Sequence, residues 1–168
     1  MNKYDVVIIG AGPAGGQCAR QLARQNRKVL VVERVTDFSQ NNFSSAGAPL
    51  ETVTDFGLPE ETIGAYWTEL FCQTKNFSGN WVSSKPLGVV FDFKKLREFL
   101  LRDAQQNGSV EVRMGYTFLQ VRRDEGLSEI SLKNVATGEI TSVFTKVLLD
   151  ATGPARKVVY SSEEVQPQ

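Results

Sequence analysis

The chain has 168 residues, a length typical of one domain, and 41% of them are hydrophobic, enough for a buried core. Its 19 basic and 19 acidic residues cancel, which argues against an extended surface for nucleic acid or an anionic membrane. The absence of histidine excludes Ser-His-Asp and Cys-His catalysis and histidine-liganded metals, and two cysteines cannot form a Cys₄ site. Redox chemistry would therefore require a bound organic cofactor.

The N-terminal residues predict a first β-strand. Val6 to Ile9 is a continuous β-branched run, as expected of a parallel strand buried on both faces. Asp5 interrupts the apolar stretch and glycines end it early, which disfavours a signal peptide. No stretch of the sequence approaches the length of a transmembrane span. Only two cysteines, far apart in sequence, disfavour a disulfide framework, and we expect a reducing, cytoplasmic compartment.

A G-x-G-x-x-G pattern follows the first strand. It is formed by Gly10, Ala11, Gly12, Pro13, Ala14 and Gly15. The first glycine permits a tight turn, the second lets a pyrophosphate approach the backbone, and the third lets the next helix pack closely. Pro13 suits the first turn of a helix that we expect to run to about Asn26. The helix N-terminus offers free N–H groups and partial positive charge to phosphates.

An acid stands at the end of the second expected strand. Val29 to Val32 forms the strand, and Glu33 follows 18 residues beyond Gly15 (33 − 15), close to the spacing of about 20 in dinucleotide-binding units. A carboxylate there can accept hydrogen bonds from ribose hydroxyls and would repel a 2′-phosphate, which disfavours NADP at this site. The simpler alternative to a dinucleotide site is a plain βαβ unit whose Gly-rich turn binds no ligand.

The segment from 50 to 92 gives the weakest signals. "LPEETIGAYWTEL" starts like a helix, whereas "NWVSSKP" and "LGVVFDF" favour two strands around Lys85-Pro86. The aromatic residues of the segment fit either an ordinary core or an apolar substrate pocket; they are Trp67, Phe71, Phe77 and Trp81. Cys18 is expected to pack inside the first helix, and a reactive thiol at Cys72 is disfavoured.

The third part of the chain favours FAD over NAD. A helix is predicted over Phe93 to Gln106, with a stop at Asn107-Gly108, and a strand over Val110 to Met114. Alternating β segments follow, "YTFLQVRRD", "LSEISLKN" and "ITSVFTKVLLD", which predict a three-stranded meander. An NAD-binding domain usually continues through helical crossovers instead. The chain then returns to an apolar strand that ends in Asp150-Ala151-Thr152-Gly153.

Together these motifs resemble the N-terminal part of FAD-dependent oxidoreductases of the p-hydroxybenzoate hydroxylase and geranylgeranyl reductase type. The resemblance rests on "DVVIIGAGPAGGQCARQLA", "VLVVER", "FDFKKLREFLLRDAQQNG", the meander and "VLLDATG", and it covers nearly the whole chain. It implies an α/β fold with a Rossmann-like parallel sheet and a meander crossover over 1–168. Residues 50–92 would then be the start of a substrate-side segment.

The resemblance also implies site residues for FAD. Gly10 to Gly15 would face the pyrophosphate, Glu33 would hold the adenosine ribose, and Arg34 would lie along the adenine. The backbone at Phe118 would meet the adenine, and the second motif near the dinucleotide would be Asp150, Ala151, Thr152 and Gly153. No residue is assigned a catalytic role, and no metal is expected.

Three features depart from the family pattern. Phe93 stands where members often carry an arginine that reaches the cofactor, and only "SSAGA" in the loop from Thr36 to Pro49 is similar to a Gly-rich segment near the flavin. Members are also considerably longer. We therefore expect a fragment that lacks a third motif and most of the substrate domain, and that is inactive by itself.

The resemblance implies NAD(P)H as electron donor to the full-length enzyme and a small, apolar or aromatic substrate, either reduced or hydroxylated. Peripheral membrane association is expected if that substrate is a lipid, and exposed apolar surface would favour self-association. Two alternatives stay open: a dinucleotide-binding module without catalysis, and an NAD-binding dehydrogenase domain.

Overall fold

The computed structural model describes residues 2–41, 44, 46–124 and 126–161, and the chain divides into two compact units. The first unit comprises Met1–Asn41 and Arg97–Gln168, and the second comprises Asn42–Leu96. The part of the "SSAGA" segment at Ser45 and the residues beyond 161 lie outside the described residues.

The first unit contains a six-stranded mixed sheet. Its strands, in spatial order, are β8 (Val110–Met114), β2 (Val29–Glu33), β1 (Lys3–Ile9), β11 (Ile140–Asp150), β10 (Leu127–Asn134) and β9 (Tyr116–Asp124). Neighbours from β8 to β11 are parallel, and β11, β10 and β9 are antiparallel. The Rossmann-like sheet and the meander predicted from the sequence are thus both present.

Strand β11 belongs to both parts of the sheet. Its first half pairs antiparallel with β10, from Ile140 opposite Lys133 to Thr145 opposite Ser128. Its second half pairs parallel with β1 and ends with Asp150 opposite Ile9. The last strand of the meander and the returning apolar strand are therefore one continuous strand.

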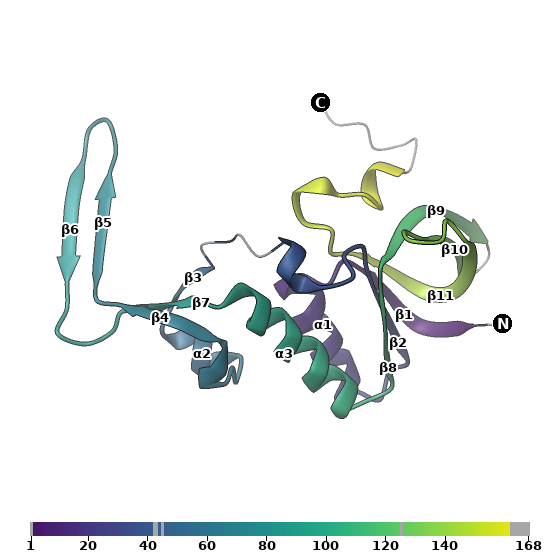
Figure 1. Ribbon diagram of the computed structural model, residues 1–168, viewed down its shortest axis with the longest axis horizontal. Helices are drawn as coiled ribbons and strands as arrows, with labels where there is room; N and C mark the ends of the chain where they lie inside the picture. Colours follow the sequence, from purple (N-terminus) through teal and green to yellow (C-terminus); the bar gives the residue numbers. More distant parts are fainter. Residues whose placement is uncertain (1, 42–43, 45, 125, 162–168) are drawn as a thin grey trace. The chain divides into compact units, whose positions relative to one another are not determined.

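Strands β1 and β2 are buried on both faces. On one face, alternate residues of β1 and β2 pack with α1 (Pro13–Ala23) and with α3 (Phe93–Gln106), which Figure 1 shows together beside the sheet. On the other face they pack with the meander through Ile130, Leu132 and Val143. This two-sided burial explains the unbroken β-branched run in the sequence.

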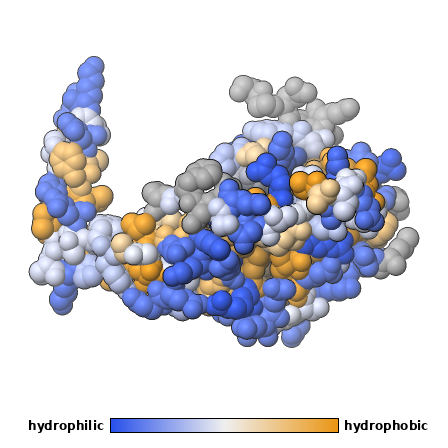
Figure 2. Space-filling view, in the orientation of Figure 1, coloured by the Kyte–Doolittle hydropathy of each residue, from blue (hydrophilic) through white to orange (hydrophobic). Residues whose placement is uncertain are grey.

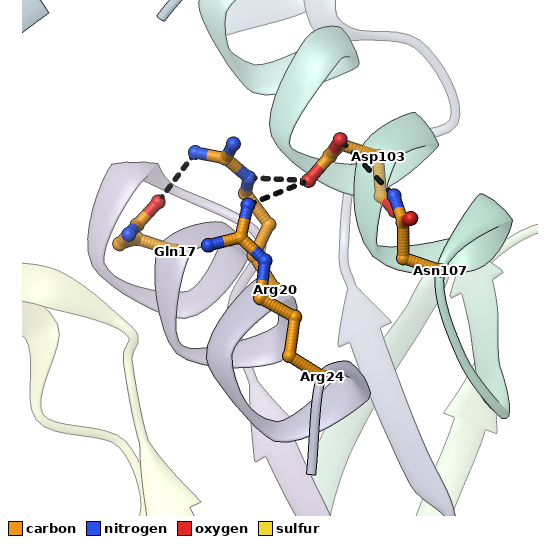
Figure 3. Close-up of polar contacts among 5 residues, drawn as sticks. All are labelled: Gln17, Arg20, Arg24, Asp103 and Asn107. Carbon is orange, nitrogen blue, oxygen red and sulfur yellow. Dashed lines mark hydrogen bonds and ion pairs between the residues drawn. The ribbon is translucent and has the colours of Figure 1, made fainter. Parts of the chain in front are cut away.

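Close packing and a buried ion pair join the two helices (Figure 3). A Cβ on Gly16 would lie 2.8 Å from Cβ of Leu100, so only glycine lets α1 approach α3 this closely. Nε of Arg20 lies 2.7 Å from Oδ2 of Asp103, and the Arg20 side chain is only 2% exposed. Arg24 adds a longer contact to the same oxygen, at 3.8 Å.

The second unit is built from short elements. Strands β3 (Gly47–Pro49), β7 (Gly88–Phe91) and β4 (Ile63–Trp67) form one antiparallel sheet, with β7 in the middle. Strands β5 (Glu69–Gln73) and β6 (Ser78–Val82) form a separate hairpin. A short helix, α2 (Glu51–Asp55), and a 3₁₀ turn, η2 (Glu60–Thr62), complete the unit.

The prediction that "LPEETIGAYWTEL" starts a helix is wrong. Only the 3₁₀ turn forms, and the chain then continues as β4 and β5. The backbone of Thr62 accepts a hydrogen bond from the Asp92 N–H at 2.9 Å, and β4 pairs with β7 from Ile63 onward. At Gly64 a Cβ would lie 3.2 Å from the Val90 carbonyl oxygen, so this strand approaches its neighbour closely. Non-local pairing with β7 thus overrides the local helical start signal.

The aromatic residues of the hairpin are not core residues of this chain. Phe71, Phe77 and Trp81 are 59%, 52% and 49% exposed, and Figure 2 shows apolar side chains in orange on the hairpin. Trp67, by contrast, is half-buried and its Nε1 donates to the Val89 carbonyl. The core interpretation therefore fails for the three hairpin aromatics. Cys72, on the same hairpin, is also exposed.

The helices in the described part of the chain are all too short or too polar to cross a membrane. Cys18 is half-buried beside the core, as expected, and burial raises the pKa of its thiol.

Candidate dinucleotide site

Three strand ends meet at one edge of the sheet. Strands β1, β2 and β11 run in the same direction, and Ile9 pairs with both Val32 and Asp150. Loops at the carboxyl ends of such strands form the ligand crevice of open α/β sheets. The Gly-rich segment, Glu33 and the turn after Asp150 are thereby brought to the same edge.

The three glycines of the motif have different environments. Gly10 has a φ of 105°, which favours glycine, and a side chain there would collide with the carbonyl oxygen of Ala151. A side chain on Gly15 would collide with the carbonyl oxygen of Gly10. At Gly12, by contrast, a Cβ would meet no atom within 4 Å. The fold itself thus requires Gly10 and Gly15, whereas Gly12 leaves open space beside the backbone.

That open space lies at the start of α1. Gly12 is the N-cap residue and supplies no side-chain cap, Pro13 opens the helix, and the first turn contains no acidic residue. The first N–H groups of a helix have no partner within the helix and carry partial positive charge. The helix terminus therefore suits an anion such as a phosphate.

Glu33 is bonded to the Gly-rich segment. Its Oε2 accepts a hydrogen bond from the Ala11 N–H at 2.8 Å, and its Oε1 accepts one from the Val35 N–H at 3.1 Å. The carboxylate therefore ties the end of β2 to the loop after β1. Each carboxylate oxygen has more than one lone pair, so ribose hydroxyls can still donate to it. Arg34, the next residue, is exposed.

Asp150 organises the turn that follows β11. Oδ1 accepts from the N–H and the hydroxyl of Thr152, at 3.0 and 2.6 Å. Oδ2 accepts from the N–H groups of Val158 and Val159, at 2.9 and 3.0 Å. Burial alone would raise the pKa of Asp150, but these four hydrogen bonds outweigh it and lower the pKa.

A hollow of about 340 Å³ lies between this turn and the start of α1. It is lined by Ala14, Asp150, Ala151, Gly153, Arg156 and Val159. Four of these residues come from the two glycine-containing motifs identified in the sequence, Ala14 from the first and Asp150, Ala151 and Gly153 from the second. The sequence motifs did not include Arg156 and Val159. Arg156 could have been found from the sequence, because it is a basic residue three positions after Gly153.

Sequence reasoning also missed Arg97. This residue is 4% exposed, its Nη2 donates to the Phe38 carbonyl at 2.8 Å, and its guanidinium lies 4.5 Å from the Phe38 ring centroid. Burial lowers the pKa of Arg97, and the negative charge of Glu33 counteracts this effect. Arg97 thus holds the 3₁₀ turn η1 (Phe38–Asn41) and places positive charge near Glu33.

Phe118 lies apart from the hollow. It is half-buried on β9, opposite Leu132 of β10, and packs against the core cluster that contains Val32. Neither Phe118 nor Arg34 is among the residues that line the hollow. Their predicted adenine contacts remain predictions.

The arrangement is suited to binding rather than to acid–base chemistry. Both carboxylates at this edge, Glu33 and Asp150, accept hydrogen bonds from the protein itself. Among the described residues, no cluster of Cys, Asp and Glu side chains could hold a metal ion. The features that remain available to a ligand are a helix terminus, open space at Gly12 and the hollow.

The chain is similar in sequence to several known proteins. A sequence profile described as FAD dependent oxidoreductase matches residues 5–161. The chain is 29% identical to a digeranylgeranylglycerophospholipid reductase of Haloferax volcanii, over 92% of this chain and 36% of that protein. It is 30% identical to a tryptophan 2-halogenase of Chondromyces crocatus, over 89% of this chain and 30% of that protein.

The fold is also similar to a solved structure. A geranylgeranyl bacteriochlorophyll reductase-like protein of Thermoplasma acidophilum matches with a TM-score of 0.84 and 20% identity. The match covers 97% of this chain and 42% of that one. The chain therefore spans less than half the length of the relatives that it matches.

Proposed function

The chain belongs to the family of FAD-dependent oxidoreductases, and on this premise we propose that it is the FAD-binding portion of a flavin-dependent oxidoreductase. The observation that carries the proposal is the open backbone at Gly12. The two flanking glycines are fixed by contacts within the fold, yet the middle position faces space at a helix N-terminus. A dinucleotide pyrophosphate has the charge and size for that space.

The residues present fit this cofactor. Gly10 to Gly15 would face the pyrophosphate, with Pro13 and Ala14 in the first turn of α1. Glu33 would accept the ribose hydroxyls, while Arg34 and the backbone of Phe118 would lie along the adenine. Asp150, Thr152 and Gly153 would border the dinucleotide from the second turn, beside the hollow.

The division of chemistry follows from this arrangement. A bound flavin supplies the electron or hydride transfer that the amino acids of this chain cannot supply. The chain's own residues would bind and orient the cofactor: Glu33 would hold the adenosine ribose, and the α1 terminus would hold the pyrophosphate. We assign none of them as a catalytic acid or base.

For the longer protein we propose NAD(P)H as electron donor and an apolar or aromatic small molecule as substrate. The chain is about equally similar to a prenyl-lipid reductase and to a halogenase, so identity does not select the reaction. Reduction of a prenyl group and hydroxylation of an aromatic or lipid both remain candidates. The donor is tested by following the oxidation of NADPH and of NADH by the longer protein with FAD and each substrate class. No oxidation of either nucleotide with either class would contradict the proposal.

The second unit is proposed as the start of the substrate side.

Exposed apolar residues on the hairpin favour self-association of this chain, since contiguous apolar surface is rare on monomers. Sedimentation of the wild type and of Trp81→Ser tests this. Identical monomeric profiles at all concentrations would rule out the hairpin as an association surface.

Cofactor identity is tested by titrating the chain with FAD, FMN and NAD⁺ and following the affinity of each. A site for the adenosine and pyrophosphate of FAD predicts that FAD binds and that ADP displaces it, whereas FMN, which lacks adenosine, binds far more weakly. Tighter binding of NAD⁺ than of FAD would favour the dehydrogenase alternative. Binding of FAD by the longer protein without any turnover would favour the non-catalytic module.

A further inference from the structure

We propose that Arg156 supplies the positive charge that holds the pyrophosphate of the bound dinucleotide, so that the hollow beside it is the phosphate end of the site. This inference rests on the proposed function, and it concerns a residue outside the Gly-rich motif. It makes Arg156 a determinant of affinity for ligands that carry a diphosphate.

The first argument is the position of Arg156. It lines the hollow together with Ala14, which belongs to the first turn of α1, and with Gly153. The hollow therefore has the N-terminus of α1, which suits an anion, on one side and Arg156 on the other. A phosphate at this terminus would lie beside the guanidinium.

The second argument is the balance of charge around the hollow. Arg156 is the one basic residue and Asp150 the one acidic residue among those that line it. Asp150 accepts four hydrogen bonds from Thr152, Val158 and Val159, so the turn holds its carboxylate and none of these bonds comes from Arg156. The guanidinium charge therefore remains available for an anionic ligand.

The third argument is the way the turn presents Arg156. Its φ of 42° is left-handed, which is uncommon for a residue with a side chain. Two backbone hydrogen bonds hold this conformation: the Arg156 N–H donates to Gly153 at 3.2 Å, and the Tyr160 N–H donates to Arg156 at 3.0 Å. The backbone at Arg156 is thus fixed by its own turn.

The fourth argument is the number of donors left over. Within the described part of the chain, the Arg156 side chain makes one hydrogen bond, from Nη1 to the Tyr160 hydroxyl at 3.3 Å. A guanidinium has five N–H donors in a planar fork, so four remain. That fork matches two oxygens of a phosphate group, and such charge-assisted pairs are stronger than neutral hydrogen bonds.

The test compares Arg156→Gln with Lys157→Gln, using ADP as the probe and calorimetry on the full chain. Lys157 is the matched control because it is exposed in the same turn, carries the same charge and does not line the hollow. We expect Arg156→Gln to weaken ADP binding at least about tenfold, which corresponds to about 1.4 kcal/mol. Lys157→Gln should bind ADP as the wild type does, and both variants should melt at the wild-type temperature.

A third variant separates charge from structure. Arg156→Lys keeps the charge and loses the fork, so its ADP affinity should lie between those of the wild type and Arg156→Gln. ADP binding by Arg156→Gln should also depend less on salt concentration than binding by the wild type. Equal ADP affinity in the two glutamine variants, or Arg156→Lys as weak as Arg156→Gln, would overturn the assignment while leaving FAD binding intact. A wild type that binds neither FAD nor ADP would overturn the proposed function and this inference together.

Discussion

Single residues at the strand ends have separable roles in folding and in binding. Gly10 and Gly15 are required because their neighbours occupy the volume that a side chain would need. Gly12 has no such neighbour, so its small size matters only when a ligand is present. Glu33 combines both roles, since it joins two backbone segments and is the proposed ribose acceptor.

The replacement Gly12→Val tests the ligand role alone. A valine at this position fits the open space and the extended backbone, where φ is −69° and ψ is −179°. We expect FAD binding to be lost while the melting temperature stays near that of the wild type. The contrasting variant Gly15→Val should lose stability even without ligand. Normal FAD affinity in Gly12→Val, measured by titration, would mean that the loop is only a structural turn.

The replacement Glu33→Ala should affect stability and binding together. It leaves the N–H groups of Ala11 and Val35 without their acceptor, and unpaired polar groups cost about 1–3 kcal/mol. Losing bonds from ribose hydroxyls to a charged group should weaken FAD binding by about 1.5–3 kcal/mol. Urea unfolding measures the first effect and titration the second. A destabilised variant with unchanged FAD affinity would restrict Glu33 to its structural role.

At the scale of elements, the sequence predicted most long, patterned segments more closely than the short ones. Helix α1 is an exception, since it ends at Ala23 and not at about Asn26 as predicted. The sequence predicted α3 and β8 with the bounds observed, because periodicity and a Gly stop are local signals. The segment around Ile63 was misjudged because its strand depends on pairing with β7, which lies more than twenty residues later. The continuity of β11 across both halves of the sheet depends likewise on non-local pairing.

The turn after β11 should give stability a specific pH dependence. The lowered native pKa of Asp150 means that its charged form is favoured by folding. This contribution is complete above the unfolded pKa of about 3.9 and is lost as pH falls through the lower native value. We therefore expect Asp150→Asn to be less stable than the wild type at pH 7 and to lose less stability on acidification. Parallel stability–pH curves for the two proteins would contradict this account.

The contact between α1 and α3 should depend mainly on one ion pair. Arg20→Met leaves the partly buried Asp103 without its 2.7 Å partner, and breaking a buried pair costs about 3–5 kcal/mol. Because Asp103 is 21% exposed, we expect the lower end of that range. Arg24→Met is the control, since Arg24 is 52% exposed and such pairs contribute about 0–1 kcal/mol. Equal free energies of unfolding in the two variants would show that the buried pair is not the main contact.

At the scale of the whole molecule, local spacing located the candidate site but not its internal bonding. The Gly-rich motif follows β1, and Glu33 and Asp150 end β2 and β11, so their meeting at one edge was predictable from parallel topology. The hydrogen bonds from the Ala11 N–H to Glu33 and from Arg97 to the Phe38 carbonyl join residues that lie 22 and 59 positions apart, and no local pattern specifies them. The roles of Phe118 and Arg34 toward adenine remain predictions.

The central claim is that FAD binds at the strand ends of the first unit. It is tested most directly by amide NMR of the isotope-labelled chain during a titration with FAD. The account predicts that the perturbed resonances belong to residues 10–16, 33–35 and 150–159, while those of the β5–β6 hairpin stay in place. Perturbations confined to residues 63–91, or no perturbation at any FAD concentration that stays in solution, would contradict it.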